Sequence, residues 1–254
     1  MKKTFLITVS LLGMSAAGVA FASGGETHHK QQNWSFDGVF GKVDKQSAQR
    51  GFQVYKEVCA ACHGLNRIAF RNLADLGFSE AEIKALAASY KVPTMNDDDG
   101  TMTERNALPS DYIPSPFPNE QAAAAGFSGK APPDLSLIVK ARPDGANYLY
   151  SLLTGYGQTP PAEHIVPEGL HYNPYFAGGN IIMPAPLSDG QVSYEDGTKA
   201  SIDQMSQDVT NFLQWAAEPE MEARKQMGIK TLIYLAIFTA FMYIAKRNLW
   251  KKLH

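Results

Sequence analysis

The residues with the clearest chemistry are Cys59-Ala60-Ala61-Cys62-His63, which hold the only two cysteines in a chain of 254 residues. Cysteines three residues apart project from one side of a helical turn. Both thiols can therefore add to the two vinyl groups of one porphyrin, and the adjacent imidazole can reach its iron. The motif predicts one covalently bound haem c, attached at Cys59 and Cys62, with His63 as an axial ligand.

Three other uses of the cysteine pair are chemically possible. A disulfide can form in an exported protein. A redox-active dithiol is usually found next to a βαβ pattern, which the surrounding sequence lacks. A structural zinc site takes about four ligands, but the chain has no further cysteine, and His28 and His29 lie in an N-terminal tail. We favour haem attachment because it uses every residue of the motif.

The second axial ligand is expected to be a thioether or another imidazole. Met183 lies in the stretch NIIMPAPL, where isoleucines and a leucine supply apolar walls and prolines stiffen the loop. His164 and His171 are rival ligands in the same long connection. The other methionines lie in terminal apolar segments, on a helix core or beside acidic residues: Met1, Met14, Met95, Met102, Met205, Met221, Met227 and Met242.

The N-terminal segment is typical of a secretory signal peptide. Lys2 and Lys3 precede an apolar run, and Ala20-Phe21-Ala22 has the pattern of a cleavage site. We expect residues 1–22 to be removed and the mature chain to begin at Ser23.

A second apolar segment lies near the C-terminus. Gly228–Ala245 is long enough to cross a hydrocarbon core, at about 1.5 Å per residue. Because basic residues follow it, we expect residues 224–247 to be a transmembrane anchor and residues 248–254 a cytoplasmic tail. An exported domain, residues 23–223, would then face the periplasm from a bacterial inner membrane.

Charge is divided unevenly along the chain. Residues 26–222 contain all 25 acidic residues and 14 of the 23 basic ones, a net charge of −11. An acidic domain repels nucleic acid and steers basic proteins towards it. The sequence therefore predicts protein partners and a membrane, and no nucleic acid.

The fold class expected for the exported domain is mainly α, of the cytochrome c type. Apolar periodicity predicts helices with long irregular loops between them. The loops are expected over residues 91–133 and 155–190, and loops of this length tend to be functional. The predicted helices are Lys45–Cys62, Ser79–Tyr90, a short one from Pro132, Ala146–Tyr156 and Asp203–Ala217.

Several stretches resemble the cytochrome c1 family, the haem subunits of cytochrome bc1 complexes. They are QRGFQVYKEVCAACHGL (Gln49–Leu65), PPDLSLIVKAR (Pro132–Arg142), NYLYSLLTGY (Asn147–Tyr156), GLHYNPYFAGGNIIMPAPL (Gly169–Leu187) and DVTNFLQWAAEPEMEARKQMG (Asp208–Gly228). The resemblance covers the chain from Trp34 to the anchor.

The resemblance implies roles for further residues. Met183 matches the distal ligand, Arg142 and Tyr148 match positions near a haem propionate, and Pro133, Leu153 and Ile181 match the haem walls. Some bacterial relatives have an extra cysteine pair and an insertion before the distal methionine, and this chain has neither. We therefore expect packing alone to hold the distal loop.

The resemblance also implies function. Such a subunit is not an enzyme by itself: within a dimeric quinol:cytochrome c oxidoreductase it takes electrons from the Rieske iron–sulfur protein, beside cytochrome b, and passes them to a soluble or tethered c-type cytochrome. The alternatives are a free-standing tethered cytochrome shuttle, the haem subunit of a periplasmic dehydrogenase, and a haem peroxidase.

Overall fold

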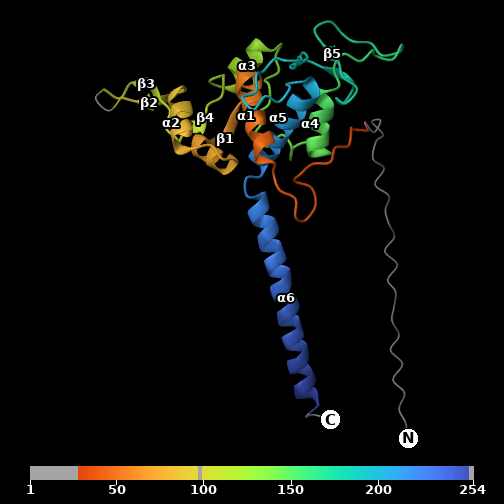
Figure 1. The fold of residues 1–254 in the computed structure, drawn as a ribbon. Helices are drawn as coiled ribbons and strands as arrows, with labels where there is room; N and C mark the ends of the chain where they lie inside the picture. The colour runs from red at the N-terminus through yellow and green to blue at the C-terminus, as the bar shows by residue number, and fades with distance from the viewer. Residues whose placement is uncertain (1–27, 97–98, 252–254) are drawn as a thin grey trace.

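The computed structural model describes residues 28–96 and 99–251. These residues form a mainly helical domain, from which one long helix, α6 (Met221–Trp250), extends alone (Figure 1). The predicted fold class is confirmed. The expected signal peptide, residues 1–22, lies outside the described residues.

The domain contains five further α-helices within the described residues: α1 (Lys45–Glu57), α2 (Glu80–Ala88), α3 (Glu120–Gly126), α4 (Gly145–Leu153) and α5 (Ile202–Ala217). Two 3₁₀ segments are Cys59–Ala61 and Phe70–Leu76. Short strands pair antiparallel, β1 (Leu65–Ala69) with β4 (Tyr112–Ile113), β2 (Lys91–Met95) with β3 (Met102–Asn106), and β5 (His171–Tyr172) with β6 (Asn180–Ile181).

The helices begin where side chains satisfy the free amides of the first turn. Asp44 accepts from the amides of Gln46 at 3.0 Å and Ser47 at 3.2 Å, which starts α1. A capping box starts α2, since the Ser79 amide donates to the Glu82 carboxylate at 2.7 Å and the Glu82 amide donates to the Ser79 hydroxyl at 3.3 Å.

The core is organised by α1 packed against α5. Gly51 of α1 lies so close to α5 that a Cβ atom there would come within 2.0 Å of the Asp208 carbonyl oxygen. This approach lets the rings of Phe52 and Tyr55 reach Phe212 of α5, at centroid distances of 5.5 and 5.9 Å. All three aromatic residues are buried.

A buried ion pair accompanies this helix crossing. Asp208 is fully buried, and its carboxylate accepts two hydrogen bonds of 2.9 Å from Arg50 and one of 2.8 Å from Ser47. The hydrogen bonds that Arg50 donates to Asp208 raise the pKa of Arg50. A second branch of the same guanidinium donates to Asp196 at 2.9 Å. A bidentate pair of this kind fixes the register of two helices as well as neutralising the charge.

Residues 91–133 are not the irregular loop that the sequence predicts. They contain the β2–β3 hairpin, β4 and α3. In the hairpin, Lys91 pairs with Asn106 and Met95 with Met102. Only Val92 is buried among the ten paired residues, so the two strands carry no apolar alternation from which they could have been predicted.

The short helix expected from Pro132 is also wrong, because residues 135–143 form successive turns. The carboxylate of Asp134 binds the amides of Asn66 at 2.8 Å and Ser136 at 2.8 Å, where a helix cap would bind the next turn of its own helix. Three predicted helices end early: α1 ends at Glu57, α2 at Ala88 and α4 at Leu153.

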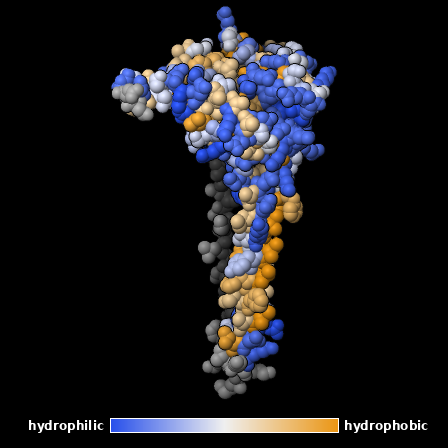
Figure 2. All heavy atoms as spheres, turned by 60° about the vertical axis from the view of Figure 1, so that its left-hand side comes forward, coloured by the Kyte–Doolittle hydropathy of each residue, from blue (hydrophilic) through white to orange (hydrophobic). Residues whose placement is uncertain are grey.

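Helix α6 has the length and composition of a membrane span: its most apolar window has a mean hydropathy of 1.7 and none of that window is buried in the structure. Figure 2 shows an apolar surface running down this helix below a domain that is largely hydrophilic. Only Glu218, Pro219 and Glu220 separate α6 from α5. The expected anchor, residues 224–247, lies within α6.

We predict that Gly51→Ala lowers the free energy of unfolding by about 1–3 kcal/mol, because the added methyl group meets backbone that cannot move without separating α1 from α5. Urea titration of the full-length chain in detergent measures the change. Gly126→Ala, at the end of α3, is the control, since a Cβ atom there meets nothing within 4 Å. Equal stability of the two variants would contradict the close crossing.

Candidate functional site

The cysteine motif lies directly after α1 and folds into a tighter turn than the predicted helix. The Val58 amide closes the last turn of α1 on the Val54 carbonyl at 2.9 Å. The Cys59 carbonyl then accepts from the amides of both Cys62, at 3.1 Å, and His63, at 2.9 Å. One carbonyl therefore holds both cysteines and the histidine in a single compact turn.

The environment of Cys59 does not favour a redox-active dithiol. Burial of the thiol, together with the neighbouring Cys62, raises the pKa of Cys59 to about 12. Redox-active cysteines require the opposite, a thiolate stabilised at neutral pH. A half-buried neutral thiol is instead suited to a thioether bond, which carries no charge.

His63 is arranged as a metal ligand. Its Nδ1 atom lies 2.7 Å from the carbonyl oxygen of Pro133, which can only accept, so Nδ1 carries the proton and the lone pair of Nε2 points elsewhere. Burial lowers the pKa of His63, against the opposing effects of the Pro133 carbonyl and Asp134. The imidazole is thus neutral and oriented, as a metal-ligating histidine must be.

Pro133 is itself fixed by hydrogen bonds between its segment and the chain that follows the motif. The Leu135 amide donates to the Gly64 carbonyl at 2.9 Å, and the Arg67 amide donates to the Ser136 hydroxyl at 3.1 Å. On the other side, the Tyr55 hydroxyl donates to the His63 carbonyl at 3.1 Å. The family resemblance makes Pro133 part of the haem wall. In the structure its carbonyl oxygen is the hydrogen-bond partner that orients His63.

A second cluster contains Met183, Tyr156, Tyr148 and Arg142. The Tyr156 hydroxyl donates to the Met183 carbonyl at 3.0 Å. Burial, with the neighbouring Tyr148, raises the pKa of Tyr156. Burial also raises the pKa of Tyr148, against the guanidinium of Arg142, which lies beside its hydroxyl. In the structure the Arg142 guanidinium lies near the Tyr148 hydroxyl, and Tyr156 is hydrogen-bonded to Met183.

The distal loop is held by more than the packing expected from the sequence. Met183 and Leu153 are half-buried against the core, and Ile181 is buried. Ile181 also pairs with His171 in the β5–β6 ladder. Tyr156 supplies the hydrogen bond to Met183, so this residue, which the sequence places only on a helix face, is a supporting residue that the sequence reasoning missed.

The two rival histidines have other partners or positions. His164 Nε2 lies 2.9 Å from the Asn180 side-chain oxygen, and its ring stands edge-on to Tyr172 at a centroid distance of 4.9 Å. His171 is an exposed residue of β5. Their surroundings favour Met183 over either imidazole as the second ligand.

The residues of the site suit a covalently held haem better than a bare metal ion. They offer two thiols, an oriented neutral imidazole, a thioether and a guanidinium that can face a carboxylate. In the described part of the chain, no group of three or more histidines, cysteines, aspartates and glutamates could hold a metal ion. This donor set agrees with the haem interpretation and not with zinc.

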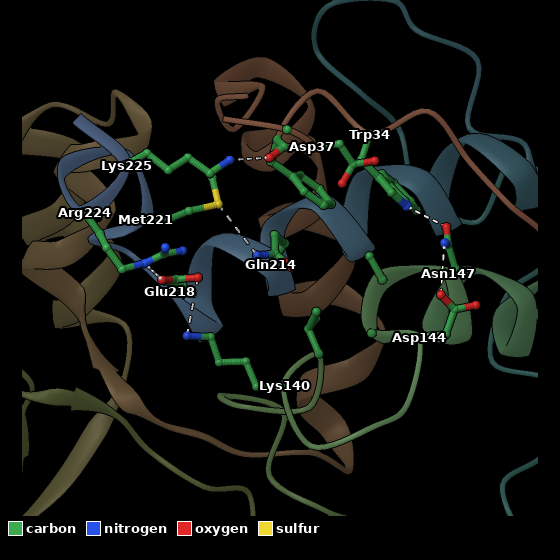
Figure 3. A pocket seen from close by; sticks show the side chains of 15 residues that line it. Trp34, Asp37, Lys140, Asp144, Asn147, Gln214, Glu218, Met221, Arg224 and Lys225 are labelled. Atoms are coloured by element: carbon green, nitrogen blue, oxygen red, sulfur yellow. Dashed lines mark hydrogen bonds and ion pairs between the residues drawn. The ribbon is translucent and has the colours of Figure 1, made fainter. Parts of the chain in front are cut away.

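A separate groove lies near the junction of the domain with α6. This groove has a volume of about 510 Å³. It lies between the segment of Trp34 and Asp37, the start of α4 and the α5–α6 junction. Figure 3 shows cationic and acidic side chains from several elements around it, among them Lys225 and Glu218. None of the predicted site residues lines this groove.

Comparison with known proteins agrees with the motifs. Residues 34–253 match the model of the cytochrome c1 family. Cytochrome c1 of Rhodospirillum rubrum is 46% identical, over 97% of this chain and 98% of the relative. The cytochrome b/c1 protein of Bradyrhizobium diazoefficiens is 46% identical over 98% of this chain, which spans 39% of that relative. The mitochondrial cytochrome c1 haem protein of Saccharomyces cerevisiae is 48% identical over 88% of this chain and 72% of its own length.

We predict that replacing Cys59 or Cys62 singly with serine leaves haem attached by one thioether, and that the double variant retains none after denaturation. Haem staining of a denaturing gel of the full-length protein distinguishes these cases. The unsubstituted chain is the control. Full staining of the double variant would show that the motif is not the attachment site.

Proposed function

Since the chain belongs to the cytochrome c1 family and carries a covalently bound c-type haem, we propose that it is the electron-transfer subunit of a cytochrome bc1 complex. The haem, when bound, supplies one-electron redox chemistry. The chain's residues would attach it and ligate it. The chain has no catalytic role of its own within the quinol–cytochrome c reductase.

The hydrogen bond from His63 to the Pro133 carbonyl is the observation that carries this proposal. It fixes the tautomer and the direction of the imidazole, so that Nε2 can serve as one axial ligand. Cys59 and Cys62 lie in the same turn and supply the two attachments. Met183, whose carbonyl accepts from Tyr156, would supply a thioether ligand to the iron when haem is bound.

Two filled axial positions suit electron transfer and not a peroxidase. A peroxidase needs an open position at which its substrate can bind. A thioether ligand opposite an imidazole also raises the potential. Arg142 and Tyr148 face a haem propionate in this proposal, with Pro133, Leu153 and Ile181 as walls.

The junction between domain and membrane supports a subunit of a larger complex over a tethered shuttle. A shuttle needs a long flexible linker, but here Glu218 lies in the short connection between α5 and α6 and is itself paired. Its carboxylate binds Arg224 of α6 and lies 3.4 Å from the Lys140 ammonium. The domain therefore has little freedom to swing away from the anchor.

The proposed partners are cytochrome b, the Rieske iron–sulfur protein and a c-type cytochrome acceptor, in a dimeric complex. The Bradyrhizobium relative supports the first, because its name joins cytochrome b and c1 in one longer chain. The net charge of −11 between residues 26 and 222 suits a basic acceptor. The basic residues after the apolar part of α6 favour a cytoplasmic C-terminus and a periplasmic haem domain in a bacterial inner membrane.

We predict that Met183→Leu lowers the midpoint potential by on the order of 0.1 V or more, within the roughly 0.8 V range set by axial ligands. Redox titration of the full-length protein measures it. Met95→Leu is the control, because Met95 is 63% exposed on β2. A midpoint unchanged by Met183→Leu, but shifted by His164→Ala or His171→Ala, would transfer the ligand role to that histidine.

We predict that extraction of native membranes in mild detergent yields this chain together with cytochrome b and a Rieske protein, and that the preparation reduces a c-type cytochrome with quinol. Affinity purification through a C-terminal tag, followed by mass spectrometry and a quinol oxidation assay, tests both points. Purification with only dehydrogenase subunits, or of a lone cytochrome, would refute the complex.

A further inference from the structure

A loop at the base of the domain exposes two adjacent apolar side chains. Val39 is 62% exposed and Phe40 is 82% exposed, between Gly38 and Gly41. A single exposed apolar residue needs no explanation, whereas an adjacent pair at a loop tip indicates a contact surface. Residues 38–41 form this tip loop.

The tip loop is attached to the first turns of α6. The Lys225 ammonium donates to the carbonyl of Phe36 at 2.6 Å and to that of Gly41 at 3.2 Å, so it binds the chain on both sides of the tip. Figure 3 shows Lys225 extending from α6 to the segment that carries Asp37. The Val43 amide adds a bond of 3.2 Å to Glu222, one turn earlier on α6. Figure 1 shows this loop hanging below the domain beside the start of α6.

The position of Lys225 along α6 sets the depth of the loop. The apolar run begins at Gly228, three residues further on, which corresponds to about 5 Å along a helix. Arg224 and Lys225 therefore lie where the helix enters the headgroup region, since cationic side chains occupy that level of a span. A loop clamped by Lys225 lies at the same level.

The loop is built to present its tip in one conformation. A Cβ atom on Gly41 would come within 2.0 Å of the Asp37 carbonyl oxygen, so the chain doubles back tightly there. The Lys42 amide donates to the Ser35 carbonyl at 2.9 Å. At its base the buried ring of Phe36 stacks on Trp34 at a centroid distance of 5.3 Å. The exposure of Val39 and Phe40 is thus a property of a fixed turn.

We propose that the tip loop is a second membrane contact, which inserts Val39 and Phe40 into the outer interface of the lipid bilayer beside α6. Lipid is the favoured occupant because the loop lies at interface depth, and Lys42, the residue after the loop, lies with Arg224 and Lys225 of the helix on the cationic side of the apolar pair. An aromatic side chain with neighbouring cations is typical of the interfacial region. Two contacts, α6 and the loop, would fix the tilt of the haem domain over the membrane.

The test is a spin label at the tip. The chain has no cysteine outside the haem motif, so Phe40→Cys in the haem-loaded, full-length protein gives one labelling site. Ile165→Cys is the matched control, because Ile165 is also 82% exposed but lies in the long connection between α4 and β5. Each labelled protein is placed in vesicles of phosphatidylcholine and phosphatidylglycerol, and collision rates with oxygen and with a water-soluble nickel complex are measured by electron paramagnetic resonance.

We expect the label at position 40 to show a several-fold higher ratio of oxygen to nickel collisions than the label at 165. Val39→Cys should behave like Phe40→Cys. Equal ratios at 40 and 165 would overturn the proposal. Protection at 40 that appears only after cytochrome b is added, and not in vesicles of this chain alone, would also overturn it by showing a protein contact. The unsubstituted chain, treated with the same reagent, checks that no label attaches at the motif.

Discussion

The close packing of α1 against α5 is the constraint on which the rest of the domain depends. Gly51 lies against the backbone of Asp208, and the carboxylate of the same aspartate holds Arg50 in a buried ion pair. One residue of α5 thus provides both the closest backbone contact and the charge that fixes the register. Because α1 runs on directly into the cysteine motif, this crossing determines where Cys59 and His63 lie. The loops are arranged around the turn of the cysteine motif, and the crossing of α1 and α5 determines where that turn lies.

The site joins segments that are far apart in sequence, mainly through backbone groups. Pro133 orients His63 with its carbonyl oxygen, and Tyr156 holds Met183 by its carbonyl. A backbone acceptor is well suited to this purpose, because it cannot ionise and cannot rotate away. The chemistry of the ligands therefore depends on the positions of two loops, and those positions depend on hydrogen bonds such as that between the Leu135 amide and the Gly64 carbonyl.

Much of the fold and of the site could be predicted from the sequence, because the features that carry the signal are local in the chain. Cys59, Cys62 and His63 form a local motif. The apolar periodicity of α1 and α5 and the continuous apolar run of α6 are also local. The hydrogen-bond partner of His63 is not local, because a carbonyl acceptor has no side-chain signature and any residue could supply it. The β2–β3 hairpin was missed because it buries only Val92. The helix predicted from Pro132 was wrong because Asp134, a carboxylate after two prolines, resembles a helix cap. In the structure this carboxylate binds the amide of Asn66.

The junction with α6 links the site to the membrane. Glu218 is paired with Arg224 and Lys140, and Lys225 and Glu222 hold the N-terminal segment. These contacts join the turns before α4, the connection between α5 and α6, α6 itself and the chain before α1 at one point, which holds the anchor against the domain. A haem domain fixed in this way cannot carry electrons by its own diffusion. In the proposed electron transfer the partners would then have to move, and the acidic surface of the domain would act on their approach.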